Sequence, residues 1–248
     1  MTETAKITHF NSFLKQMSIP ELLAVPKDLQ PIPGTNNFFY FGALHLVHGL
    51  AKTGKTHFVL ETLNYAKNVD VIWLDGDFND AVMVNQFKNI THLTPLESDA
   101  YLDMWINADV DYTNKIFIID SLKDFKNKQD MDTNSGMDAI IKRFKCFTKK
   151  AATVIVIHHS TVKYGVSSSA NKIKIKGNEE AIYSNCDITY LFTRDFDSNL
   201  SELLCERSRV NYIQSGAIFK KNGPHKKWQN KDKSILKRTD NATNTVIK

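Results

Sequence analysis

Short apolar runs recur along the chain and alternate with stretches of helical periodicity. Runs such as VIW, IFII and TVIVI are apolar at consecutive positions, which is typical of strands buried on both faces of a parallel sheet. Strands are predicted at 43–48, 70–75, 115–120, 152–158 and 187–193, with a β-rich part at 201–220. Helices are predicted at about 55–67, 79–90, 134–150 and 177–185. This alternation predicts an α/β fold with a mainly parallel sheet flanked by helices.

The two ends of the chain depart from this alternation. Residues 1–40 are predicted to be an N-terminal appendage with two short amphipathic helices and a proline-rich linker at 26–37. Residues 41–219 are predicted to form one domain. Residues 220–248 hold nine Lys/Arg against two Asp, so this tail carries +7 and the rest of the chain about −2. Composition supports two interpretations of the tail equally: a handle for nucleic acid, or a flexible solvated end.

Composition also narrows the class of protein. No run approaches the roughly 18 apolar residues that a membrane span needs, and the first residues lack the pattern of a secretory signal. Cys146, Cys186 and Cys205 lie far apart with no C-x-x-C spacing. We therefore expect reduced thiols in a cytoplasmic protein, without a disulfide framework or a zinc site.

The segment after the first predicted strand carries the pattern G-x-x-x-x-G-K-[ST]. With a strand before it and a helix after it, this pattern predicts a phosphate-binding loop whose backbone N–H groups face a triphosphate. Lys55 is expected to contact the β- and γ-phosphates, and the Thr56 hydroxyl to ligate Mg²⁺. The loop therefore predicts a bound nucleoside triphosphate and Mg²⁺, and the family resemblance described below implies that the nucleotide is ATP. The predicted nucleotide-binding residues are Gly49, Lys52, Thr53, Gly54, Lys55 and Thr56.

Acidic residues end two other predicted strands. Asp120 follows KIFII and is expected to bind Mg²⁺ beside Thr56, although a strand-terminal Asp is also a common turn former. VIWLDGDF ends in Asp75 and Asp77. If strand 70–75 lies beside the phosphate-loop strand, Asp77 would face the γ-phosphate and orient the attacking water. Asp75 is the competing candidate, and a purely structural turn around Gly76 is the third interpretation.

Two histidines end the strand VIVIHHSTVK. Neighbouring side chains of a strand point to opposite faces, so His158 and His159 are expected to diverge. One should point to the core or the top of the sheet. The other should face the nucleotide, hydrogen-bond the γ-phosphate and report its loss to the following loop. Alternatively, both are polar residues with satisfied hydrogen bonds at a strand end.

This order of motifs resembles the RecA/DnaB-like ATPases, and most closely the single-domain RepA-like hexameric replicative helicases of plasmids and phages. HHSTVK at 158–163 is similar to the HH-[ST]-x-K sequences of that group, and the resemblance covers about residues 40–215. It implies a RecA-like fold and the roles given above for Lys55, Thr56 and Asp120. It also implies a catalytic acid at Asp77, where the family usually has Glu, and a γ-phosphate sensor at His159.

The resemblance extends to CERSRVNY. Arg207 and Arg209 resemble a Lys-x-Arg pair that such ring ATPases insert into the nucleotide site of the neighbouring subunit, with Arg in place of Lys. In GTPases an arginine supplied in this way is worth ~10³–10⁵ in rate. Alternating arginines are also common on solvated edge strands.

Two polar segments, 123–136 and 161–177, are expected to be mobile loops at the carboxyl edge of the sheet. The resemblance implies that they line a channel for single-stranded DNA, bound without sequence preference and in a salt-sensitive way. The predicted nucleic-acid-binding residues are Lys123, Lys126, Lys128, Lys163, Lys172, Lys174 and Lys176. A solvated face is the alternative.

Taken together, the resemblance implies a ring-forming, ATP-dependent motor on single-stranded DNA, with RNA not excluded. The expected protein is a hexameric homo-oligomer and a replicative DNA helicase of a plasmid, phage or other mobile element. A RecA-like ATPase without unwinding activity, such as a recombination mediator or a recruiting switch, is the alternative. A small-molecule kinase is a third class, but the five arginines of the chain form no dense lid segment.

Overall fold

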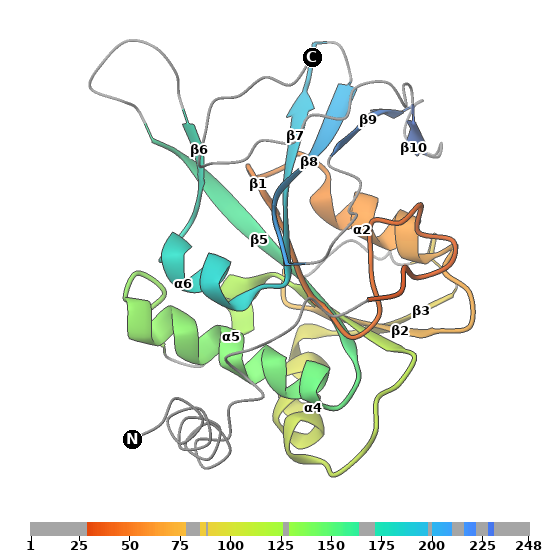
Figure 1. Cartoon of the computed structure of the whole chain (residues 1–248), viewed down its shortest axis with the longest axis vertical. Helices are drawn as coiled ribbons and strands as arrows, with labels where there is room; N and C mark the ends of the chain where they lie inside the picture. The colour runs from red at the N-terminus through yellow and green to blue at the C-terminus, as the bar shows by residue number, and fades with distance from the viewer. Residues whose placement is uncertain are drawn as a thin grey trace, which may run out of the picture.

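The computed structural model describes residues 29–77, 85–87, 89–125, 129–163, 172–197, 200–209, 216–221 and 228–230 (Figure 1). The sheet has the strand order β10-β9-β8-β7-β1-β5-β4-β2-β3, and β6 pairs with β5. The strands are β1 (Leu44–Gly49), β2 (Asp70–Asp75), β3 (Ile90–Leu93), β4 (Lys115–Asp120), β5 (Thr153–Lys163), β6 (Lys172–Ile175), β7 (Ile188–Asp195), β8 (Leu200–Ser208), β9 (Gly216–Lys221) and β10 (Trp228–Asn230). The helices are α2 (Lys55–Leu63), α4 (Pro95–Asn107), α5 (Asn134–Lys149) and α6 (Glu179–Asn185), with a 3-10 turn η1 (Leu122–Phe125).

Six neighbouring strands of the sheet, β7, β1, β5, β4, β2 and β3, run parallel. β8, β9 and β10 continue the sheet in antiparallel pairing. The predicted mainly parallel α/β sheet is therefore confirmed. The phosphate-loop strand β1 lies between β5 and β7, and β5 and β4 separate it from β2. The assumption that strand 70–75 lies beside the phosphate-loop strand was wrong. The reason is that β5, which comes later in the sequence, is inserted beside β1.

Two hydrophobic layers cover the central strands. Val47, Ile118 and Ile155 pack on the face covered by α2. Their neighbours along the strands pack against α5 and α6 on the opposite face (Figure 1). Because successive side chains of a strand point to opposite faces, only consecutive apolar residues can fill both layers. This arrangement explains the uninterrupted runs IFII and TVIVI.

Three helices begin at side-chain caps that their sequences supply. The Thr133 hydroxyl accepts the Gly136 N–H at the start of α5, and the Asn178 carbonyl accepts the Ala181 N–H at the start of α6. At α4, the Thr94 N–H donates to the Glu97 carboxylate. Such caps satisfy N–H groups that have no partner within the helix. Neither α4 nor β3 was among the predicted elements, and most of the helix predicted at 79–90 lies outside the described residues.

The segment predicted as a loop at 161–177 contains paired strand at 161–163 and 172–175. β5 continues to Lys163, and β6 pairs with it antiparallel, with Val162 opposite Ile173. The KIKI sequence of β6 alternates with period two, and Ile175 is buried while Lys174 is half-buried. Only residues 164–171 of this segment lie outside the described part.

Both ends of the chain contribute to the folded part. Ile32, Phe38 and Phe39 are buried in the α2-side core, and the Tyr190 hydroxyl donates to the Phe38 carbonyl over 2.8 Å. Residues 29–40 of the predicted appendage thus pack on the domain, while 1–28 lie outside the described residues. In the predicted tail, β10 pairs with β9. Among the helices that the structure describes, none has the length and apolar character to cross a membrane.

Candidate functional site

The phosphate-binding loop curls between the end of β1 and the start of α2. Gly54, at the N-cap of α2, has φ 97°, a left-handed conformation that favours glycine. Gly49 approaches β7 so closely that a Cβ atom there would lie 2.1 Å from the Phe192 carbonyl oxygen. Both glycines of the motif are therefore required by the backbone, one by its conformation and one by its packing.

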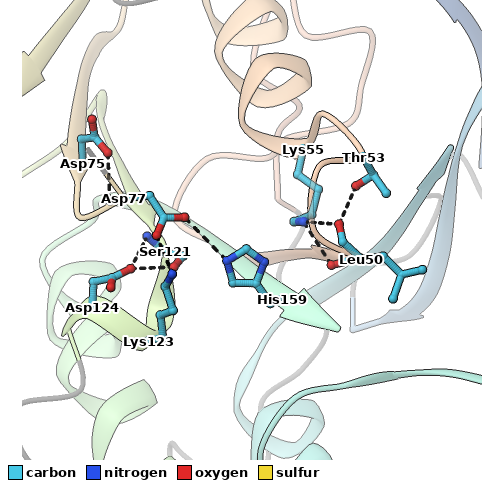
Figure 2. Close-up of polar contacts among 10 residues, drawn as sticks. Leu50, Thr53, Lys55, Asp75, Asp77, Ser121, Lys123, Asp124 and His159 are labelled. Atoms are coloured by element: carbon cyan, nitrogen blue, oxygen red, sulfur yellow. Dashed lines mark hydrogen bonds and ion pairs between the residues drawn. The ribbon is translucent and has the colours of Figure 1, made fainter. Parts of the chain in front are cut away.

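Lys55 is buried and folds back over the loop (Figure 2). Its Nζ donates to the carbonyl oxygens of Gly49 and Leu50, over 3.0 Å and 2.8 Å. The Thr53 hydroxyl donates to the same Leu50 carbonyl. Burial lowers the pKa of Lys55 to about 8, although Asp120 and Asp77 act in the opposite direction. A desolvated ammonium inside a glycine-bounded loop is suited to bind phosphate oxygens.

Asp120 ends β4 and is buried. Burial raises its pKa to about 7, and a hydrogen bond from the Thr56 side chain opposes this shift. A hydroxyl and a carboxylate side by side match the oxygen ligands that Mg²⁺ prefers. The residues predicted to bind ATP and Mg²⁺ therefore fit these ligands in position and in chemistry.

Asp77 reaches the same edge although β2 is separated from β1. The carboxyl ends of parallel strands meet at one edge of a sheet, and the turn after β2 extends along it. Asp77 Oδ1 lies 2.7 Å from Lys123 Nζ, and Asp77 Oδ2 lies 3.6 Å from His159 Nε2 (Figure 2). Burial raises the pKa of Asp77, but Lys123 and His159 outweigh it and hold the pKa below its usual value.

Asp75 shapes the turn that carries Asp77. Its Oδ1 accepts the Asp77 N–H over 3.1 Å, and its Oδ2 lies 3.0 Å from His92 Nε2. At Gly76, a Cβ atom would lie 2.5 Å from the Asp124 Cβ, so the turn packs tightly on η1. Asp75 is buried whereas the Asp77 side chain is 27% exposed, so Asp77 is the more accessible of the two candidate acids.

The two histidines diverge in the way that strand geometry requires. His158 is buried, and its Nε2 donates to the carbonyl of Lys176, the residue directly after β6. Burial lowers its pKa to about 3, so the ring is neutral at pH 7. His159 instead faces Asp77 and lies between Asp77 and the phosphate-binding loop in Figure 2. Its position is compatible with the predicted contact to a γ-phosphate, and that role stays a prediction.

A buried network around His48 was not among the predicted site residues. His48 Nε2 donates to Glu206 Oε2 over 2.7 Å, and His48 Nδ1 lies 2.8 Å from Ser160 Oγ. The Tyr183 hydroxyl donates to the same Glu206 oxygen. Glu206 lies at a register shift between β7 and β8, and bulges of this kind redirect a side chain. The sequence offered one signal for this network, a polar His48 directly before Gly49. It could not indicate the partner, because Glu206 lies 158 positions later.

We expect His48→Ala to destabilise the fold by about 2–4 kcal/mol, because it empties a buried site and leaves the Ser160 hydroxyl and the Glu206 carboxylate without this partner. Glu206→Gln, which keeps the shape and can still accept a hydrogen bond, should cost about 1 kcal/mol. Urea unfolding of the two variants and the unmodified chain measures both values. A His48→Ala protein as stable as the unmodified one would contradict a structural role for the network.

Arg207 and Arg209 are exposed and lie at different levels of the sheet. Arg207 pairs with Thr189, which is level with Leu46 of β1. The Arg209 N–H donates to the Asp187 carbonyl, and the Asp187 carboxylate accepts the Leu44 N–H at the start of β1. From Leu44 to Gly49 the strand rises by five steps, or ~16 Å. The Arg209 guanidinium donates to the Ser184 carbonyl. Arg209 therefore lies away from the loop of its own chain, and a role at a nucleotide would require another subunit.

The predicted nucleic-acid-binding lysines have different surroundings. Lys123 was expected on a mobile loop, but it lies on η1, directly after β4, and its ammonium pairs with Asp77. Lys174 lies 3.9 Å from Glu179, and Lys176 is exposed. Lys163 and Lys172 pair across the β5–β6 hairpin. Lys126 and Lys128 lie outside the described residues.

The architecture has a counterpart among solved structures, although the sequence has no match. No protein-family model matches the chain, and no curated protein matches its sequence. A crystal structure of the RadB recombinase is similar, with a TM-score of 0.52 and 18% sequence identity. The match covers 73% of this chain and 88% of that chain. At this identity the likeness shows the fold alone. The chain therefore has the RecA-like P-loop fold, as the order of its motifs predicted.

Proposed function

We propose that the chain is an ATP hydrolase that acts on single-stranded nucleic acid as a homo-oligomer. One observation carries the proposal. The phosphate-binding loop, the Thr56–Asp120 pair and the Asp77–His159 pair meet at the carboxyl edge of one sheet. This edge is where open α/β sheets bind their ligands.

Each residue of the site has a distinct task in hydrolysis. The loop N–H groups and Lys55 bind the phosphate oxygens, while Thr56 and Asp120 hold Mg²⁺. When bound, Mg²⁺ supplies positive charge that neutralises the phosphate oxygens. Asp77 orients the attacking water and accepts its proton. His159 hydrogen-bonds the γ-phosphate side of the site.

Nucleic acid binds, in this proposal, along the paired strands β5 and β6, the β5–β6 hairpin. Lys174 and Lys176 lie on it or directly after it, and the Lys176 carbonyl contacts the buried His158. His159 is the next residue of β5, so loss of the γ-phosphate can be transmitted to the hairpin through the strand. Lysines bind phosphates without reading sequence, so DNA and RNA are both possible ligands.

We place the protein in the cytoplasm, since its three cysteines are free thiols.

The position of Arg209, away from the loop of its own chain, fits a site completed between subunits, and a hexameric ring is the assembly that we propose. Arg209→Ala and Lys55→Ala proteins should each be inactive alone. Mixed together they should regain part of the activity, because an intact loop of one subunit can meet an intact arginine of another. Phosphate release from a mixing series, normalised to total protein, measures this. Activity of Arg209→Ala alone at the unmodified rate would remove the arginine from the site.

The proposed function is tested by ATP hydrolysis with and without single-stranded DNA or RNA, across a salt series. We expect stimulation by single strands that weakens as salt rises. A protein that does not hydrolyse ATP under any of these conditions would overturn the proposal.

Two activities fit this ATPase, and strand displacement separates them. A replicative helicase should displace a labelled strand from a forked duplex with ATP. A recombination mediator or recruiting switch should hydrolyse ATP on single strands without displacement. The likeness to the RadB recombinase favours the second candidate, while the HHSTVK sequence favours the first.

A further inference from the structure

The Asp77 carboxylate is held by a charged partner. Oδ1 pairs with the Lys123 ammonium at 2.7 Å, and Oδ2 faces His159 at 3.6 Å (Figure 2). A carboxylate that orients an attacking water must face that water with an oxygen that can accept its hydrogen bond. In the observed arrangement the short contact to Lys123 fixes the direction in which the carboxylate faces.

Lys123 is held in place from two sides and is still accessible. Asp124, whose carboxylate accepts the Ser121 hydroxyl over 2.7 Å, lies beside the pair and adds a second negative charge near the ammonium. The Lys123 side chain is 41% exposed, compared with 27% for Asp77. An anion arriving from solvent therefore reaches the lysine more readily than the aspartate.

The proposed function indicates what kind of anion this is. The phosphates of a single-stranded nucleic acid bind lysines without reading sequence, and the partly exposed Lys123 ammonium lies beside the proposed ATP site.

We propose that Lys123 is a positioning residue that restrains Asp77 through their ion pair. When a single-stranded nucleic acid binds, its backbone phosphates bind the Lys123 ammonium in place of Asp77. This inference rests on the proposed function and adds to it the link between the two ligands. When Lys123 turns to a phosphate, the Asp77 carboxylate is no longer held in this direction and can turn toward the attacking water. Loss of the nearby ammonium also raises the pKa of Asp77 and makes it a stronger base.

Lys123→Gln tests the link, because it removes the charge and keeps most of the side chain's length. A partly exposed ion pair is worth little, so we expect the basal ATPase rate without nucleic acid to rise about fivefold. The stimulation by oligo(dT) should fall correspondingly, towards one. The effect should appear in kcat, with KM for ATP little changed. Lys123→Arg keeps the charge, so its basal rate should lie below that of Lys123→Gln.

Lys115→Gln is the matched control. Lys115 lies at the other end of β4 and forms an ion pair of similar length with Asp70, 2.8 Å, far from the site edge. It should leave the basal rate and the stimulation unchanged. Melting temperatures of the variants check that neither change acts through loss of the fold.

Three results would overturn the inference. An unchanged basal rate with full stimulation in Lys123→Gln would show that the pair does not restrain Asp77. Loss of turnover with and without oligo(dT) would make Lys123 a contributor to the chemistry itself. If the unmodified protein hydrolyses ATP at a rate that nucleic acid does not change, the ATPase activity stands but the proposed link between Lys123 and nucleic acid is refuted. Absence of hydrolysis in every protein would instead overturn the proposed function.

Discussion

Lys55→Ala is expected to reduce ATP hydrolysis by about 10³-fold or more while leaving the fold intact. Lys55 places an ammonium within the phosphate-binding loop, and no other described lysine is held by the Gly49 and Leu50 carbonyls. Removing one preorganised donor from such a site typically costs about 10²–10³ in rate, and a charged donor is worth more than a neutral one. Phosphate release under saturating ATP measures the loss.

Stability should change little in this variant. Burial already disfavours the charged form of Lys55, as its lowered pKa indicates, so its removal takes away a desolvated charge as well as two hydrogen bonds. Exposed Lys67, just after α2, offers a control: Lys67→Ala should match the unmodified protein in rate. A Lys55→Ala protein that hydrolyses ATP at the normal rate would mean that the loop is not the nucleotide site.

Asp77→Asn is expected to retain ATP binding and to lose turnover by about 10²–10⁴-fold, because an amide cannot accept the proton of the attacking water. The substitution keeps the shape of the side chain, so the turn after β2 should be preserved. Binding of a fluorescent ATP analogue, measured beside single-turnover hydrolysis, separates the two effects.

Asp75→Asn is the comparison that decides between the two acids. Asp75 holds the Asp77 N–H and His92, so its change should lower stability more than it lowers turnover. The reverse pattern, with Asp77→Asn active and Asp75→Asn inactive but folded, would move the catalytic acid to Asp75.

Local patterns of the sequence were sufficient for much of the fold. The strands 70–75 and 115–120 were predicted with the bounds that the structure has, because both of their faces are buried and the apolar runs end at Asp75 and Asp120. The phosphate-binding loop was recognisable because its glycines are needed where the backbone curls. β6 was missed since KIKI is only four residues long and follows a serine-rich stretch.

Relations between distant segments could not be predicted in this way. Nothing local places β5 between β1 and β4, and this insertion decides how Asp77 meets His159. The His48–Glu206 contact and the Lys123–Asp77 pair also depend on tertiary packing. Single residues at strand ends could therefore be identified from the sequence as candidate site residues, whereas the residues that they contact could not.

The separation of Arg209 from the phosphate-binding loop bears on how copies of the chain can join. A contact that brings Arg209 to a neighbour's loop is two-fold symmetric only if both features lie within one self-complementary patch; when they lie on separate surfaces, the contact is head-to-tail. Repeated, such a head-to-tail contact closes into a ring or grows as an open helical filament. In a filament the first and last copies are unequal, one lacking donated arginines and the other offering them to solvent. A closed ring has no such ends, so all of its sites are equivalent.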